Sequence, residues 1–226
     1  MAIRKISFAV DEYYHIYNRG VEKRIIFNTE PDKHRFSKLI YLCNGTNSFK
    51  FDELVKGNEY FFDRGEPIVD ICAYCLMDNH YHLLIKEIKE GGITSFMHRL
   101  GGAYSAYFNT LNERSGSLFG GKFSAKHASD DNYLQYLIAY IHLNPIKMIE
   151  PSWREEGIKN LDQAREFIKQ YRFSSYIDYF GKGRNENRIL KMDSLPEYFD
   201  NKKEFDEYID DWLKFKNEYE SPLSLA

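Results

Sequence analysis

The sequence has few cysteines, no long apolar run and no excess of positive charge, and each absence narrows the possible functions. Its three cysteines, Cys43, Cys72 and Cys75, are too few for a disulfide framework. Cys72 and Cys75 form one CxxC pair, and without a second pair this spacing is a weak indication of zinc or redox chemistry. No stretch reaches about 18 apolar residues, and the first residues lack the pattern of a signal peptide. We therefore expect a cytoplasmic protein with no membrane partner.

The charge balance argues against a protein that binds DNA over its whole surface. The chain has 31 Lys and Arg against 34 Asp and Glu, a formal net charge of −3. Residues 1–150 hold 18 charges of each sign, whereas residues 151–226 hold 13 basic and 16 acidic residues. The N-terminal part is thus neutral and can still carry a local basic groove.

The length and apolar content fit one domain with extensions or one domain plus a small second one. The chain has 226 residues, of which 43% are hydrophobic, enough for a substantial core. We place the domain at residues 1–150 and a polar, helical C-terminal extension at residues 151–226. The 18 Tyr and 17 Phe are many for this length, and aromatic rings that do not fill the core can stack on unpaired bases.

The hydrophobic pattern predicts strands and helices in an order typical of α+β proteins. Strands are expected at 12–18, 68–76 and 80–86, and helices at 31–43, 93–111, 131–144, 160–171 and 202–217. Loops are expected at 113–128 and at 44–66, the latter as an insertion. Gly101 and Gly102 either weaken their helix or let another backbone approach it closely. This order favours a ferredoxin-like antiparallel sheet flanked by helices.

A pair of histidines on one predicted strand is the first candidate site. His80 and His82 are two residues apart, so both point to the same face of a sheet, while Tyr81 points to the other. Two adjacent imidazoles can bind one divalent ion. The motif is weak by itself, because two histidines on a solvent-exposed face would look the same.

The helix predicted at 131–144 provides the second candidate. Tyr136, Tyr140 and Asn144 recur every four residues beside its apolar stripe. A phenol and an amide one turn apart can both reach a metal beside the sheet. Alternatively, these tyrosines only pack at the edge of the core with their hydroxyls in water.

Basic side chains form the third candidate, as contacts to phosphates. An ordinary solvated surface is the alternative. The residues concerned are Arg19, Lys23, Arg24, Arg99, Lys122 and Lys126.

Four segments, in order, carry a family resemblance. They are YHIYNRGVEKRIIF (14–27), YCLMDNHYHLLIK (74–86), LFGGKFSAKH (118–127) and YLIAYIHLNPIK (136–147). Through them the chain resembles the single-tyrosine transposases of the HUH superfamily, most closely the REP-associated tyrosine transposases. It departs from the family at Asp78, where relatives usually have proline, and at Tyr81, where they have a small aliphatic residue. The 44–66 segment is also long for the family.

The resemblance implies a metal-dependent enzyme that cleaves and rejoins single-stranded or hairpin DNA. It implies Tyr140 as the nucleophile, with His80, His82 and Asn144 as ligands of Mg²⁺ or Mn²⁺. Cleavage would leave a covalent 5′-phosphotyrosine and a free 3′-OH. A single nucleophilic tyrosine per chain fits either a monomer that acts twice or a homodimer. DNA contacts are expected from the turn 19–24 and the loop 118–127, namely Arg19, Lys23, Arg24, Lys122 and Lys126.

Two other functions remain open at this point. One is a DNA- or RNA-binding protein that keeps the fold without cleavage. The other is a metal hydrolase in which His80 and His82 activate water, although Asp78 and Glu87 are the only nearby acidic residues. The hydrolase would still cleave DNA after Tyr140→Phe and would leave no covalent adduct.

Overall fold

The sheet has four antiparallel strands and the chain order of a ferredoxin-like fold. The computed structural model describes residues 6–181 and 183–214, and the strands lie in the order β2-β3-β1-β4. One helix joins β1 to β2 and another joins β3 to β4, as in the predicted α+β fold, which is confirmed. The elements are β1 (Tyr13–Arg19), α1 (Glu30–Cys43), β2 (Val69–Met77), β3 (His80–Glu87), α2 (Gly92–Leu111) and β4 (Ser124–His127).

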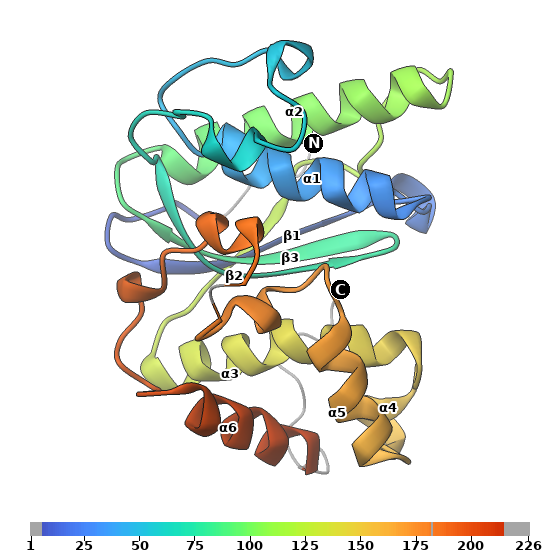
Figure 1. Cartoon of the computed structure of the whole chain (residues 1–226), viewed down its shortest axis with the longest axis vertical. Coiled ribbons are helices and arrows are strands. Elements are labelled where there is room, and N and C mark those ends of the chain that lie inside the picture. The colour runs from blue at the N-terminus through green and yellow to red at the C-terminus, as the bar shows by residue number, and fades with distance from the viewer. Residues whose placement is uncertain (1–5, 182, 215–226) are drawn as a thin grey trace.

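Helices cover both faces of the sheet. Helices α1 and α2 lie on one face, and α3 (Asp131–Leu143) lies on the other together with the C-terminal extension (Figure 1). The alternation along β3 separates its side chains between the two layers. Tyr81 packs on Phe36 of α1, with ring centroids 4.8 Å apart, whereas His82 faces Tyr140 of α3. The histidines therefore lie between the sheet and α3.

Local sequence signals explain where α1 and α3 begin. A capping box between Thr29 and Asp32 starts α1, and Asp130 accepts a hydrogen bond from the backbone N–H of Tyr133 at 2.9 Å to start α3. Helix α3 ends at Leu143, one residue before the predicted end. The chain then continues as a 3-10 helix, Asn144–Met148, in which proline is tolerated near the start.

Strand β4 was not predicted, and the expectation of a loop throughout 113–128 is wrong. Strand β4 has four residues, too few for a clear alternating pattern. It forms by pairing with β1, where Lys126 lies opposite His15. Such a pairing depends on a partner more than 100 positions away in the chain, which local pattern reading does not register.

The glycines of α2 differ from expectation. A Cβ added at Gly101 or Gly102 would meet no atom within 4 Å, so no backbone approaches the helix there. The close approach is at Gly92, where a Cβ would lie 2.2 Å from the carbonyl oxygen of Ile68. Gly92 thus lets the first turn of α2 pack directly against the segment that enters β2.

The segment predicted as a C-terminal extension covers the β2 edge of the sheet. The N–H of Leu76 in β2 donates to the carbonyl of Phe173, and that of Lys191 donates to the carbonyl of Ile71, both at 2.9 Å. These bonds occupy backbone groups that an edge strand would otherwise leave open. Its helices are α4 (Trp153–Glu156), α5 (Leu161–Gln170) and α6 (Lys202–Lys214), and residues 215–217 of the predicted last helix lie outside the described residues.

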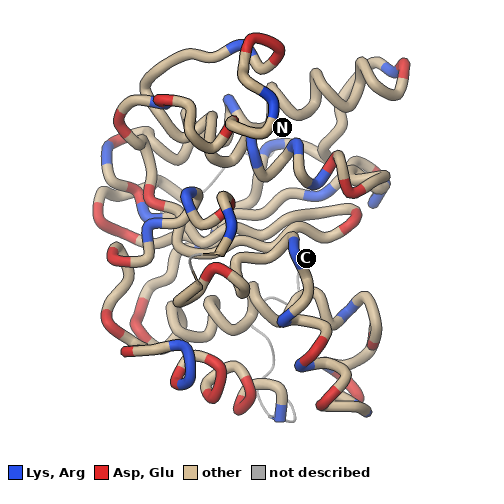
Figure 2. Tube along the Cα trace, in the orientation of Figure 1, with Lys and Arg blue, Asp and Glu red and all other residues tan. Residues whose placement is uncertain are grey.

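Charges of both signs are spread along the chain. Figure 2 shows Lys and Arg interspersed with Asp and Glu over most of the trace, with acidic positions repeated along α6. No helix within the described ranges has the length and apolar character needed to cross a membrane.

Candidate active site

The structure brings Tyr140 to the histidine pair. The rings of His80 and His82 lie side by side on β3, with centroids 5.0 Å apart. The ring of Tyr140, from α3, lies edge-on to His82 with a centroid distance of 5.5 Å. Strand and helix thus place an imidazole and a phenol next to each other across the interface between sheet and helix layer.

Both histidines are held through Nδ1. His82 Nδ1 is hydrogen-bonded to His15 Nε2 at 2.9 Å, and His80 Nδ1 to Asn79 Oδ1 at 2.6 Å. A hydrogen bond at one ring nitrogen fixes the tautomer and leaves the lone pair on the other. The partner of His80 is an amide oxygen, so its Nδ1–H donates and its Nε2 keeps the lone pair. For His82 the same form arises when its Nδ1–H donates to His15 Nε2.

Sequence reasoning did not identify His15 as part of this site. It is buried in β1, and its ring stacks on His82 and lies 5.6 Å, centroid to centroid, from Tyr140. The sequence does place His15 in the first matched segment, two residues before Tyr17, so that the two side chains share one face of the strand. The pairing that sets Tyr17 opposite His82 appears only in the fold.

The three imidazoles are neutral near pH 7. Burial, with the charges of Lys126 and Arg154, lowers the pKa of His15 to about 3. Burial and nearby cations likewise lower the pKa of His80 to about 3, and burial with the neighbouring histidines lowers the pKa of His82 well below its usual value. A neutral imidazole is the form that binds a metal ion.

Asn144 provides an oxygen that lacks a partner. Its side chain is fully buried, and its Nδ2 donates to the carbonyl oxygen of Tyr140 at 2.8 Å. Its Oδ1 is buried without a hydrogen-bond partner in the described part of the chain. An unsatisfied buried acceptor is costly, and an ion is one of its ordinary explanations.

These donors fit a divalent cation with open coordination positions. Two neutral nitrogens and one amide oxygen leave room for substrate oxygens and water, as Lewis-acid chemistry requires. Across residues 6–181 and 183–214, no group of three His, Cys, Asp or Glu side chains could hold a metal. Cys72 and Cys75 are buried free thiols, and burial raises the pKa of both, which does not favour the zinc interpretation of the CxxC pair.

The two segments predicted to contact DNA lie next to each other. The N–H of Gly120 donates to the carbonyl of Arg19 at 2.9 Å, and that of Val21 donates to the carbonyl of Leu118 at 3.0 Å. Arg19 lies opposite His80 in the β1–β3 pairing, so these segments adjoin the histidines. Lys23 and Lys122 are exposed, whereas Arg24 and Lys126 are half-buried.

Arg99 does not belong to this group. Its guanidinium donates to the carbonyl oxygens of Gly45 and Asn47 and so fastens the start of the insertion to α2. The acidic residues considered for a water-activating hydrolase are also engaged elsewhere. Asp78 pairs with Lys33 at 2.8 Å, and buried Glu87 accepts the N–H of Ile93 at 2.6 Å.

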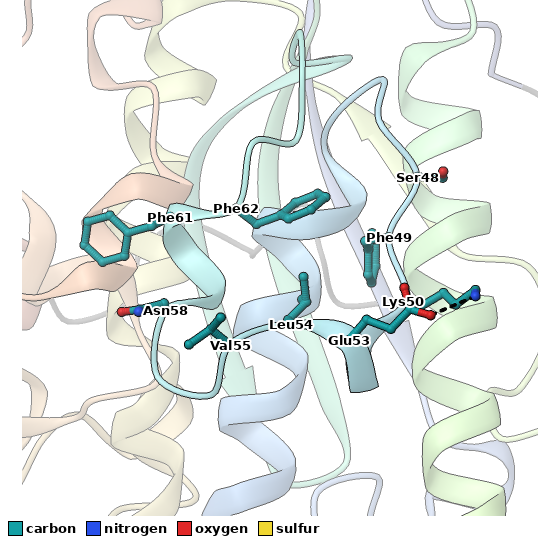
Figure 3. Close-up of a pocket in the computed structure, with 9 residues that line it drawn as sticks. All are labelled: Ser48, Phe49, Lys50, Glu53, Leu54, Val55, Asn58, Phe61 and Phe62. Atoms are coloured by element: carbon teal, nitrogen blue, oxygen red, sulfur yellow. Dashed lines mark hydrogen bonds and ion pairs between the residues drawn. The ribbon is translucent and has the colours of Figure 1, made fainter.

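The insertion at 44–66 forms a hollow of its own. It carries two short 3-10 helices, Phe51–Glu53 and Glu59–Phe61, and the second packs beside α1. Figure 3 shows apolar side chains around the hollow and an ion pair between Lys50 and Glu53 at its rim, with an N–O distance of 2.8 Å. Because α1 covers the face of the sheet opposite α3, this hollow is separate from the histidines.

Comparisons with known proteins add a family match. Residues 66–144 match the family model described as "Transposase IS200 like", and this stretch contains His80, His82, Tyr140 and Asn144. No curated protein matches the chain. A solved structure described as "Structure of the REP associates tyrosine transposase bound to a REP hairpin" is 11% identical, with a TM-score of 0.48, over 88% of this chain and 94% of its own.

Proposed function

We propose that this chain, whose residues 66–144 match the IS200-like transposase model, is a single-tyrosine transposase that cleaves and rejoins single-stranded DNA through Tyr140. One observation carries the proposal. The Tyr140 ring lies 5.5 Å from the ring of His82, and the buried, unpaired oxygen of Asn144 follows one helical turn later. A structural tyrosine at the edge of a core does not require either neighbour.

The chemical step is an attack by the phenol on the scissile phosphate. A bond forms between Oη of Tyr140 and phosphorus, and the bond from phosphorus to the 3′-oxygen breaks. The phenol gives up one proton and the departing 3′-oxygen takes one up, so the step is balanced. The phosphotyrosine keeps the energy of the phosphodiester, and a second 3′-OH can reverse the attack to join strands.

The chain's own residues prepare this step. His15 and Asn79 orient the rings of His82 and His80 through Nδ1, and burial keeps the imidazoles neutral. We assign Nε2 of both rings and Oδ1 of Asn144 to Mg²⁺ or Mn²⁺. A divalent ion held by these atoms would polarise the scissile phosphate and offset the charge that develops on its oxygens.

We assign the substrate contacts to the adjoining segments 19–24 and 118–127. Their basic side chains follow the phosphate backbone of a single strand or a hairpin, next to the histidines. The proposed DNA contacts are Arg19, Lys23, Arg24, Lys122 and Lys126.

A covalent-adduct assay tests the proposal. The full chain is incubated with Mn²⁺ and a pool of hairpin oligonucleotides that carry single-stranded 5′ extensions, and the products are separated on a denaturing gel. We expect a protein–DNA band that is absent with EDTA and absent in Tyr140→Phe, while the matched control Tyr136→Phe, one turn away on the same helix, retains it. Binding without an adduct across the pool would support the inactive binder, and cleavage that survives Tyr140→Phe would support the hydrolase.

A further inference from the structure

An arginine of the C-terminal extension lies over the Tyr140 ring. Arg154 belongs to α4, and its Cζ is 4.3 Å from the centroid of the Tyr140 ring. The side chain is half-buried, and its Nη2 is shielded from solvent. This residue lies outside the segment 66–144 that matches the transposase family, so the family match does not assign it a role.

Two more cations approach the same place from other elements. Arg19 lies opposite His80 at the end of β1, and Lys147 follows Asn144 by three residues in the 3-10 helix. Burial, together with the charges of Arg154 and Arg19 and against that of Glu155, lowers the pKa of Lys147 to about 8. The charges of Arg19, Lys147 and Arg154 all act on His80, and three cations near one neutral histidine favour a bound anion.

We propose that Arg154 binds a non-bridging oxygen of the scissile phosphate, with Lys147 and Arg19 completing a cationic site around it. The inference rests on the proposed function and extends it, because it gives the extension a part in the reaction. The phosphate has one negative charge in the substrate and gains a second as the phenol attacks. A guanidinium placed at that position stabilises the added charge more than the starting state.

The geometry also allows a purely structural contact, in which the cation packs on the aromatic face. The two roles differ in their dependence on the charge of the substrate. A packing contact acts whichever oxygens the phosphate carries, whereas a phosphate contact loses its effect when the oxygen that it binds is replaced by a methyl group.

The test therefore compares two substrates. The first is the hairpin oligonucleotide that gives the strongest adduct, and the second is the same oligonucleotide with a neutral methylphosphonate at the scissile position. In single-turnover reactions we expect Arg154→Gln to slow adduct formation on the phosphodiester by about 100-fold. The methylphosphonate is prepared as its two separate stereoisomers, and on the one whose methyl group replaces the oxygen bound by Arg154 we expect Arg154→Gln and the wild type to react at the same rate.

Controls separate charge from folding. Arg188 makes a similar contact with Phe61, at 4.7 Å from its ring centroid, so Arg188→Gln removes a cation–aromatic pair in another part of the molecule and should leave both rates unchanged. Arg154→Lys keeps the charge and should retain part of the phosphodiester rate. If Arg154→Gln unfolds, as thermal melting would show, the same substrate comparison is made with Arg154→Lys.

The outcomes distinguish this inference from the proposed function. Equal slowing on the phosphodiester and on both methylphosphonate stereoisomers, or no slowing on any of them, overturns the role of Arg154 alone. If the wild type forms no Tyr140-dependent adduct with any oligonucleotide, the proposed function is overturned and this inference with it.

Discussion

Replacing His15 by phenylalanine tests whether this residue holds His82 in the orientation that binds a metal. The substitution keeps a ring of similar size at a position that is 1% exposed, but it removes the nitrogen that lies 2.9 Å from His82 Nδ1. The His82 ring then loses its fixed tautomer and orientation. Loss of such a partner typically weakens metal binding by about 10- to 100-fold, equivalent to about 1.4 to 2.7 kcal/mol.

The assay is a Mn²⁺ titration of the DNA-free protein, with free Mn²⁺ followed by electron paramagnetic resonance. His15→Gln restores an acceptor near the same place and should recover most of the affinity. His98→Gln, which changes an exposed histidine of α2, should bind as the wild type does. If His15→Phe binds Mn²⁺ with wild-type affinity, the hydrogen bond does not prepare His82, and the assigned tautomer is wrong.

Two further predictions concern stability. In α2, Gly92→Ala should lower the free energy of unfolding by about 1–3 kcal/mol, because its Cβ would lie 2.2 Å from the carbonyl oxygen of Ile68. Gly101→Ala should raise the free energy of unfolding by about 0.5–1 kcal/mol, because the space around Gly101 is open. Urea titration measures the change in both variants. Burial lowers the pKa of His142 from 6.5 to about 3. The stability that the neutral imidazole contributes is therefore complete above pH 6.5 and is lost as the pH falls toward 3. In the metal-free protein, protonation linked to His142 should lower the free energy of unfolding by about 2 kcal/mol at pH 5. His142→Gln should make the free energy of unfolding depend less steeply on pH, whereas the control His98→Gln should leave that dependence unchanged. The same slope in His142→Gln and in the wild type would contradict this prediction.

The sheet and its first helices were predictable from the sequence because their signals are local. Alternation and composition marked β1, β2 and β3, and the apolar stripe marked α3. The same alternation placed His80 and His82 on one face. What the sequence did not give was which face α3 would cover, and hence that Tyr140 would meet His82 rather than solvent. Only the family resemblance indicated that Tyr140 and the two histidines would lie together.

The residues missed are those that reach the site through long-range packing. His15 becomes a neighbour of His82 only when β1 pairs with β3, and Arg154 reaches Tyr140 only after the chain turns back from α3. Strand β4 likewise depends on pairing with β1. In each case no periodicity in the sequence connects the two partners, so local reading could name the residue but not its contact.

The most direct measurement is the identity of the residue that becomes linked to DNA. The adduct formed with Mn²⁺ is digested with protease and nuclease, and the modified peptide is sequenced by mass spectrometry. We expect a nucleotide joined through its 5′-phosphate to the hydroxyl oxygen of Tyr140 and to no other residue. An adduct on a different side chain, or DNA cleavage with no adduct at all, would contradict it.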